Sequence, residues 1–298
     1  MRMHDDQVDV TADVARHLIA EQLPQWRGLP VTRVASAGTV NAIFRVGERV
    51  AARFPLRAEG PDEARAWLES EAAAAAELAA SVTVPAPVPL AIGSPGHGYP
   101  LPWSVQTWLE GTVATDDDPS ASVPFAEDLA TLVRDLRAVS TRGRRFSGRG
   151  RGGDLRSHDA WVETCLRRSD GLVDVPRLRR LWDRLRLLPV VASDAMCHGD
   201  LIPGNVLVRD GRLVGVLDGG GFGPADPALD LVGAWHLLDA GPRDVLREAL
   251  GCSAVEWERG RAWALEQSLG LAWYYRASNP TMSALGVRSL RRILDAED

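Results

Sequence analysis

The sequence contains no lysine, because all 34 of its basic residues are arginines. Schiff-base chemistry and a Walker-type phosphate loop both depend on a lysine amine, so both are excluded. Cysteine is scarce, and the three that occur, Cys165, Cys197 and Cys252, are scattered and odd in number. This distribution argues against a disulfide framework or a cysteine metal cluster, and it favours buried thiols.

Long hydrophobic runs are also missing. No apolar stretch approaches the roughly 18 residues that a membrane span needs, and the acidic N-terminal sequence MRMHDDQVDVTADVARHLIAEQL lacks the apolar core of a signal peptide. We therefore expect a cytoplasmic protein with no membrane partner. The net charge of −6 speaks against a nucleic-acid partner.

The 298 residues, 45% of them hydrophobic, are enough for one large domain or for two lobes with a proper core. Apolar spacing predicts a helix over 8–22, paired strands within 31–55, a helix over 61–80 and a strand ending near Gly111. After a polar linker, helices are predicted over 124–139, 158–168, 176–187, 226–239, 242–250 and 254–275. The pattern predicts an α+β protein with a strand-rich part, 1–107, and a mainly helical part, 108–298.

The segment CHGDLIPGNVLVRDGRLVGVLDGGG, residues 197–221, interrupts the helical part with a predicted hairpin. Asp210-Gly211 suits its type I′ turn. Within HGDLIPGN, the residues His198, Asp200 and Asn205 have the order and spacing H-x-D-x-x-x-x-N of a kinase catalytic loop, and Asp218 ends the next strand. Phosphoryl transfer needs positioning and charge neutralisation more than covalent chemistry, and this residue set is suited to both.

Each residue of this set has a predicted role. Asp200 would orient the acceptor hydroxyl and take its proton. Asn205 and Asp218 would hold Mg²⁺ against nucleotide phosphates, because magnesium takes few protein oxygens together with phosphate and water. A surface hairpin with turn-capping aspartates is one alternative. A His/Asp metal hydrolase is another, but no further histidine stands at ligand spacing from His198, which we expect to orient the loop.

These motifs resemble the aminoglycoside phosphotransferase family of antibiotic and small-molecule kinases. The resemblance spans nearly the whole chain, through AGTVNAIFRV, VAARFPL, ESEA, WSVQTWLEG, CHGDLIPGNVLV and VLDGGGFGPADPALDLVGAW. It implies a bilobal, protein-kinase-like fold with an N-terminal antiparallel sheet lobe that binds nucleotide and a mainly helical C-terminal lobe that carries catalysis and the substrate. It also implies Asp200 as catalytic residue, Asn205 and Asp218 as magnesium ligands, and Asp226 and Asp230 as braces of the catalytic loop.

The same resemblance predicts the nucleotide site. The loop SAGTVN would cover the phosphates with Ser36, Gly38, Thr39 and Asn41. Arg53 stands where the family commonly has a lysine, and Glu71 stands where its helical partner is found. The strand backbone around Gln106 and Trp108 would bond the purine of ATP or GTP. Arginine is not a conservative exchange for lysine, because its planar fork is wider than an ammonium.

The predicted activity is magnesium-dependent transfer of the γ-phosphoryl group of ATP or GTP to a hydroxyl of an aminoglycoside-like antibiotic, as in antibiotic resistance. A macrolide or other small-metabolite kinase is an alternative. A nucleotide-binding pseudokinase is another, since Arg53 and the glycines of DGGG depart from the family pattern. A polycationic substrate would favour carboxylates such as Asp239, Glu256, Glu258 and Glu266. The arginine-rich stretch 142–156 is expected to be a mobile loop near the cleft.

Overall fold

The computed structural model describes residues 8–34, 40–57, 60–190 and 192–296. Its contacts divide the chain into two compact units. The N-terminal unit runs through Ala80, resumes over Pro85–Glu110 and includes Asp218–Gly220; the C-terminal unit holds Ser81–Val84, Gly111–Leu217 and the chain from Gly221 onward. The predicted boundary after residue 107 falls just short of Glu110. Within the described ranges, every helix is too short or too polar to cross a lipid bilayer.

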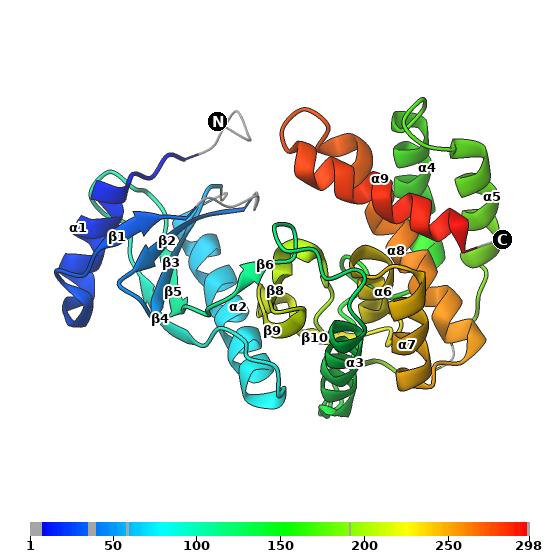
Figure 1. The fold of residues 1–298 in the computed structure, drawn as a ribbon. Helices are drawn as coiled ribbons and strands as arrows, with labels where there is room; N and C mark the ends of the chain where they lie inside the picture. The colour runs from blue at the N-terminus through cyan, green and yellow to red at the C-terminus, as the bar shows by residue number, and fades with distance from the viewer. Residues whose placement is uncertain (1–7, 35–39, 58–59, 191, 297–298) are drawn as a thin grey trace. The chain divides into compact units, whose positions relative to one another are not determined.

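The N-terminal unit is an antiparallel sheet with two long helices (Figure 1). The five strands lie in the order β1-β2-β3-β5-β4, and each pairs antiparallel with its neighbours. The elements are α1 (Ala12–Gln22), a 3₁₀ turn (Pro24–Trp26), β1 (Val31–Arg33), β2 (Asn41–Val46), β3 (Val50–Pro55), α2 (Pro61–Ser81), β4 (Pro89–Gly93) and β5 (Trp103–Thr107).

Alternation along the strands gives this sheet two different faces. Phe54 and Trp103 stack with ring centroids 4.9 Å apart in the hydrophobic core that also includes Leu18 of α1. Arg53, the neighbour of Phe54 in β3, points to the opposite face. Gly93 allows this packing, since a Cβ there would lie 2.1 Å from the Trp103 ring. The strands thus bury one face under α1 and present polar groups on the other.

The C-terminal unit is mainly helical and carries two small sheets (Figure 1). One has the strand order β6-β8-β9 and the other pairs β7 with β10. Its helices are α3 (Val123–Ala138), α4 (Asp159–Arg168), α5 (Val175–Leu185), α6 (Val232–Leu237), α7 (Ala240–Leu250), α8 (Ala254–Tyr274) and α9 (Pro280–Asp295). Its strands are β6 (Thr112–Val113), β7 (Ala195–Cys197), β8 (Val206–Arg209), β9 (Arg212–Val216) and β10 (Gly223–Ala225).

Helix α8 is the centre of this unit and packs against α4, α5, α6 and α9. Its almost continuous burial explains why amphipathic spacing describes it poorly. Helix α9 was not predicted from the sequence, although Asn279 caps it and Pro280 opens it. Gly286 weakens its helical pattern, but the missing side chain allows close approach to α8, since a Cβ would lie 2.7 Å from the Ser268 carbonyl oxygen.

Two further sequence expectations need correction. The helix predicted over 226–239 is shorter, because a 3₁₀ turn (Leu229–Leu231) precedes α6 and the aspartates before it serve tertiary hydrogen bonds. Cys165 and Cys197 are buried thiols as expected, whereas Cys252 is half-buried; all three are unpaired with one another.

The predicted hairpin is confirmed, and the positive φ values of Asp210 and Gly211 fit the type I′ turn.

Candidate active site

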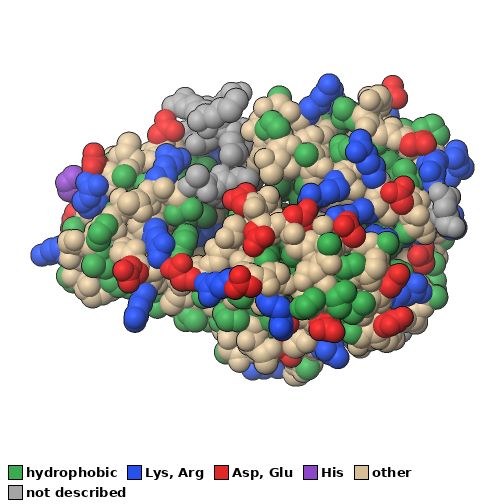
Figure 2. Space-filling model, viewed as in Figure 1, with side chains coloured by type: hydrophobic (Ala, Val, Ile, Leu, Met, Phe, Trp, Pro, Cys, Tyr) green, Lys and Arg blue, Asp and Glu red, His purple; other side chains and the backbone are tan. Residues whose placement is uncertain are grey.

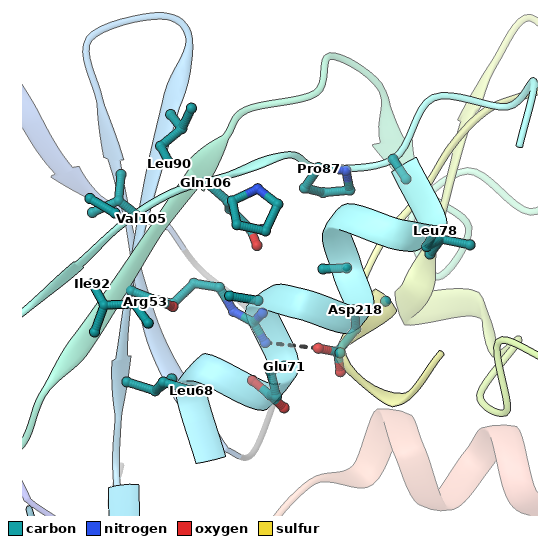
Figure 3. A pocket seen from close by; sticks show the side chains of 18 residues that line it. Arg53, Leu68, Glu71, Leu78, Pro87, Leu90, Ile92, Val105, Gln106 and Asp218 are labelled. Atoms are coloured by element: carbon teal, nitrogen blue, oxygen red, sulfur yellow. Dashed lines mark hydrogen bonds and ion pairs between the residues drawn. The ribbon is translucent and has the colours of Figure 1, made fainter. Parts of the chain in front are cut away.

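The N-terminal unit contains a cavity of about 240 Å³ between the polar face of its sheet and helix α2 (Figure 3). Arg53 of β3, Gln106 of β5 and Glu71 of α2 line it, together with Asp218. Its remaining walls are mainly apolar, from Leu68, Ala72, Ala75, Leu78, Ala86, Pro87, Leu90, Ile92 and Val105. An apolar slot with a few convergent polar groups is the usual form of a small-molecule site.

Arg53 lies at the polar end of this cavity and pairs with Asp218 (Figure 3). Its NH2 donates to Asp218 Oδ1 over 2.8 Å, and the guanidinium side chain is 14% exposed. The predicted partner was Glu71, so that pairing is wrong in this structure. All three residues that the sequence singles out line one cavity, and Arg53 pairs there with Asp218 rather than with Glu71.

The protonation of Glu71 gives a physical reason for this choice. Burial raises the pKa of Glu71 from 4.5 to about 7; Arg53 opposes the rise and the charge of Asp218 adds to it. A carboxyl group that is about half protonated at neutral pH is the weaker partner for a guanidinium. Asp218, the observed partner of Arg53, is half exposed.

The glycines after Asp218 fit tightly against helix α2. A Cβ on Gly219 would lie 2.4 Å from Leu78 Cδ2, and one on Gly220 would lie 2.8 Å from Glu71 Cγ. In sequence, DGGG departs from the family pattern. The structure supplies a local reason for it, since Leu78 fills the volume that a larger residue at position 219 would need.

The other predicted nucleotide residues have different positions. Ser36, Gly38 and Thr39 lie outside the described residues. Asn41 begins β2, and its buried Oδ1 has no donor among the residues described. Gln106 lines the cavity, but Trp108 does not: its backbone N–H donates to the Arg49 carbonyl oxygen over 2.8 Å, and its indole lies under Arg45. Trp108 continues the strand pairing, which leaves its N–H unable to bond a base.

The C-terminal unit carries the predicted catalytic loop before the hairpin β8–β9. Asn205 Nδ2 donates to Asp200 Oδ2 over 2.8 Å and to the Asp200 carbonyl oxygen over 2.9 Å. Two donors remote in sequence reach Oδ1 of the same carboxylate: Gln267 Nε2 at 2.6 Å and Arg151 NH2 at 3.1 Å. Donors from three segments thus fix the Asp200 side chain, which remains partly exposed.

Buried groups hold the loop itself in place. His198 is 1% exposed, and its Nε2 lies 2.8 Å from the Leu217 carbonyl oxygen. The carboxylate of Asp230 accepts the backbone N–H groups of His198 and Gly199 over 2.9 and 2.8 Å. Asp226 forms a buried pair with Arg259. His198 therefore orients the loop as expected, and Asp230 braces it.

The donor set at the hairpin fits magnesium. Asn205 Nδ2 donates to Asp200, so the oxygen of the same side-chain amide is the atom left to act as an acceptor or a ligand. The Leu217 N–H donates to the Asn205 carbonyl oxygen over 2.7 Å, and Asp218 is the next residue in the chain. No group of three or more His, Cys, Asp or Glu ligands occurs in the described residues. Magnesium does not need one, since one or two protein oxygens suffice beside phosphate.

The family model for the phosphotransferase enzyme family matches residues 31–263, which include the cavity residues, the catalytic loop and the start of α8. The chain belongs to the phosphotransferase enzyme family. The match confirms the resemblance seen in the sequence motifs.

Curated relatives in this phosphotransferase family share part of the sequence. The chain is 25% identical over 147 residues to an aminoglycoside 3′-phosphotransferase of Escherichia coli, covering 46% of this chain and 53% of the relative. It is 29% identical over 168 residues to an aminoglycoside 3′-phosphotransferase of Streptomyces fradiae, covering 48% and 60%. The chain thus matches less than two thirds of the length of each of these relatives.

Several solved structures share the fold over nearly the full chain. The GDP complex of an aminoglycoside 2′-phosphotransferase-IIIa aligns over 97% of this chain and 100% of its own, with a TM-score of 0.69 and 18% identity. A macrolide 2′-phosphotransferase from Brachybacterium faecium aligns over 94% and 97%, with a TM-score of 0.61 and 21% identity. The predicted α+β fold, with a sheet-bearing N-terminal part and a mainly helical C-terminal part, is confirmed.

Sequence reasoning missed two residues that bind the Asp200 carboxylate. Arg151 belongs to the arginine- and glycine-rich stretch for which the sequence predicts a mobile loop, and that prediction included no contact with Asp200. Gln267 was not singled out. It lies 67 positions from Asp200 in a helix whose sequence shows no local sign of a polar task.

Proposed function

We propose that the protein is a magnesium-dependent O-phosphotransferase that moves the γ-phosphoryl group of ATP or GTP to a hydroxyl of an antibiotic. The observation that best supports this proposal is the Asp200 carboxylate, fixed by donors on both oxygens yet still open to solvent. A carboxylate held in this way can orient an alcohol and accept its proton as the O–P bond forms.

The cavity of the N-terminal unit is proposed to take the nucleotide. Its apolar walls suit a purine, and Arg53 offers a cation to the phosphates. Asn205 and Asp218 would hold magnesium, which, when bound, neutralises charge on the phosphate oxygens. Solved relatives include complexes with GDP, ADP and ATP, which supports a nucleotide donor without choosing the base. Because such an activity consumes ATP or GTP, we propose that it operates in the cytoplasm.

Aminoglycosides are the first proposed class of acceptor. Both curated relatives are aminoglycoside phosphotransferases, and solved relatives include complexes with kanamycin, gentamicin and streptomycin.

A macrolide or another less cationic alcohol is the second candidate, and one observation favours it. The four carboxylates expected to attract a polycation all have cationic or histidine partners within the C-terminal unit: Asp239 with Arg292, Glu256 with Arg137, Glu258 with Arg261, and Glu266 with His158. Arginine and acidic side chains are also interspersed on the face shown in Figure 2. Paired carboxylates attract a polycationic substrate less strongly than unpaired ones.

The deciding experiment is a coupled nucleotide-consumption assay with Mg²⁺ and either ATP or GTP. Kanamycin, gentamicin, streptomycin and erythromycin would serve as acceptors, with mass spectrometry of the product. We expect one acceptor to gain a phosphoryl group. Asp200→Ala should abolish turnover while calorimetry still detects magnesium-nucleotide binding.

Asp210→Asn is the matched control, since it changes an aspartate of the same hairpin in a turn where asparagine keeps the left-handed backbone. It should be fully active. Unchanged turnover in Asp200→Ala would refute the proposed role. Nucleotide binding without transfer to any acceptor would favour the pseudokinase alternative.

A further inference from the structure

A line of buried polar side chains leads from the Asp200 carboxylate into the helices of the C-terminal unit. Gln267 of α8 donates its Nε2 to Asp200 Oδ1 over 2.6 Å. Its Oε1 lies 3.2 Å from Nε2 of His236 in α6, and Nδ1 of His236 lies 2.8 Å from Oγ of Ser289 in α9. His236 and Ser289 are fully buried, and Gln267 is 6% exposed.

The chemistry of the two ends fixes the direction of each hydrogen bond. An ionised carboxylate only accepts, so Gln267 presents its amide nitrogen to Asp200 and its carbonyl oxygen to His236. That oxygen also only accepts, so the proton of the imidazole sits on Nε2. Burial lowers the pKa of His236 to about 3, which keeps the ring neutral and leaves Nδ1 to accept the Ser289 hydroxyl. Every donor in the line therefore points toward Asp200.

We propose that Gln267 and His236 are positioning residues for the phosphotransfer reaction, which hold Asp200 Oδ1 so that Oδ2 receives the acceptor hydroxyl. This inference rests on the proposed function. Among the described residues, Oδ2 accepts one side-chain hydrogen bond, from Asn205 Nδ2. A carboxylate oxygen can accept two, so Oδ2 keeps one site for an alcohol, whereas Oδ1 already serves Gln267 and Arg151.

The line restrains Asp200 because each of its members is itself restrained. Gln267 sits in a buried turn of α8, and its amide cannot flip without placing two acceptors, its Oε1 and Asp200 Oδ1, against each other. His236 blocks that flip from the other side, since its Nε2–H would then meet an amide N–H. A misdirected general base loses rate even when its substrates still bind.

The first test compares Gln267→Met with the wild-type protein. Methionine keeps the size of the side chain but removes the donor to Asp200. We expect kcat to fall roughly 10- to 100-fold, the range of a lost charge-assisted hydrogen bond. The Kd for Mg²⁺-ATP should stay within about two-fold. His236→Leu should lower kcat by roughly 3- to 10-fold, and His236→Gln, which again offers an amide donor, should restore most of it.

Ser268→Ala is the matched control for fold and burial. Its buried hydroxyl has no partner among the described residues, and it lies next to Gln267 in α8. Its kcat should equal that of the wild type. The separation of a lowered kcat from an unchanged Kd in Gln267→Met, and the rescue of His236→Leu by His236→Gln, are readouts that a purely structural role would not produce.

Three results would overturn the inference in a protein that turns over. These are an unchanged kcat in Gln267→Met, a His236→Gln variant no more active than His236→Leu, and a Gln267→Met/His236→Leu double variant whose loss equals the product of the single losses. A wild-type protein without turnover would instead refute the proposed function. In that case ¹⁵N NMR of the His236 ring still tests the proposed hydrogen-bond chain. A cationic ring at pH 6, or a proton on Nδ1, would contradict the hydrogen-bond directions given above.

Discussion

Replacing Glu71 by glutamine should make the free energy of unfolding less dependent on pH between about 5 and 8. Burial is the main reason that the pKa of Glu71 rises from 4.5 to about 7, and the nearby Asp218 charge adds to it. A carboxyl group whose folded-state pKa lies above its unfolded value binds more protons in the folded state across that window. Its ionisation therefore lowers the free energy of unfolding as pH rises from about 4.5 through about 7.

The size of this effect follows from the shift. One pKa unit corresponds to about 1.4 kcal/mol, so a rise from 4.5 to about 7 would correspond to roughly 3 kcal/mol at full strength. Glu71 is only partly buried and solvent screens its charge. We therefore expect about 1 to 2 kcal/mol. Glutamine has nearly the same shape and no charge. The free energy of unfolding of Glu71→Gln, relative to that of the wild type, should therefore increase by that amount between pH 5 and pH 8.

Urea unfolding of both proteins at pH 5, 6, 7 and 8, followed by tryptophan fluorescence, measures this difference. Glu69→Gln is the control, because Glu69 lies on the same helix, is exposed and pairs with Arg65 at 3.6 Å. Its difference from the wild type should not vary with pH. A ¹³C NMR titration of the Glu71 carboxyl group should have its midpoint near 7. A midpoint near 4.5, or a pH-independent gain in Glu71→Gln, would refute the reasoning.

Three other substitutions test separate parts of the structure. Arg53→Ala should weaken Mg²⁺-nucleotide binding by more than about ten-fold and Arg53→Lys by less, since the ammonium keeps the charge but not the fork; calorimetry showing wild-type affinity for Arg53→Ala would contradict this. Asp226→Asn should cost about 3 to 5 kcal/mol of stability in urea unfolding, because Arg259 is 1% exposed and would lose its charged partner. Gly93→Ala should cost about 1 to 3 kcal/mol by overpacking Trp103, and an unchanged melting temperature would count against the packing described here.

The sequence was most informative where the chemistry is local. The spacing of His198, Asp200 and Asn205 and the Asp210-Gly211 turn describe one continuous hairpin, so the pattern alone indicates which side chains approach one another. Asn205 does bind the Asp200 carboxylate in the structure. Strand alternation likewise explains why Arg53 faces the cavity while its neighbours fill the core.

The sequence was least informative where contacts join distant segments. Arg151 and Gln267 reach Asp200 across 49 and 67 positions, and neither belongs to a recognisable spacing. The ion pair of Arg53 with Asp218 joins residues 165 positions apart, which no local spacing predicts. Helix α9 was missed because Gly286 lowers helix propensity, although its role is the close approach to α8.

Leu78 and Gly219 are distant in sequence, but the size of side chain that fits at one position depends on the residue at the other. A larger residue at 219 would collide with the leucine, and a smaller residue at 78 alone would leave a hole beside the glycine. Related proteins that carry a bulky residue after the aspartate that matches Asp218 should therefore carry a shorter side chain on the facing helix. Exchanging both positions together should be tolerated where either single exchange is not.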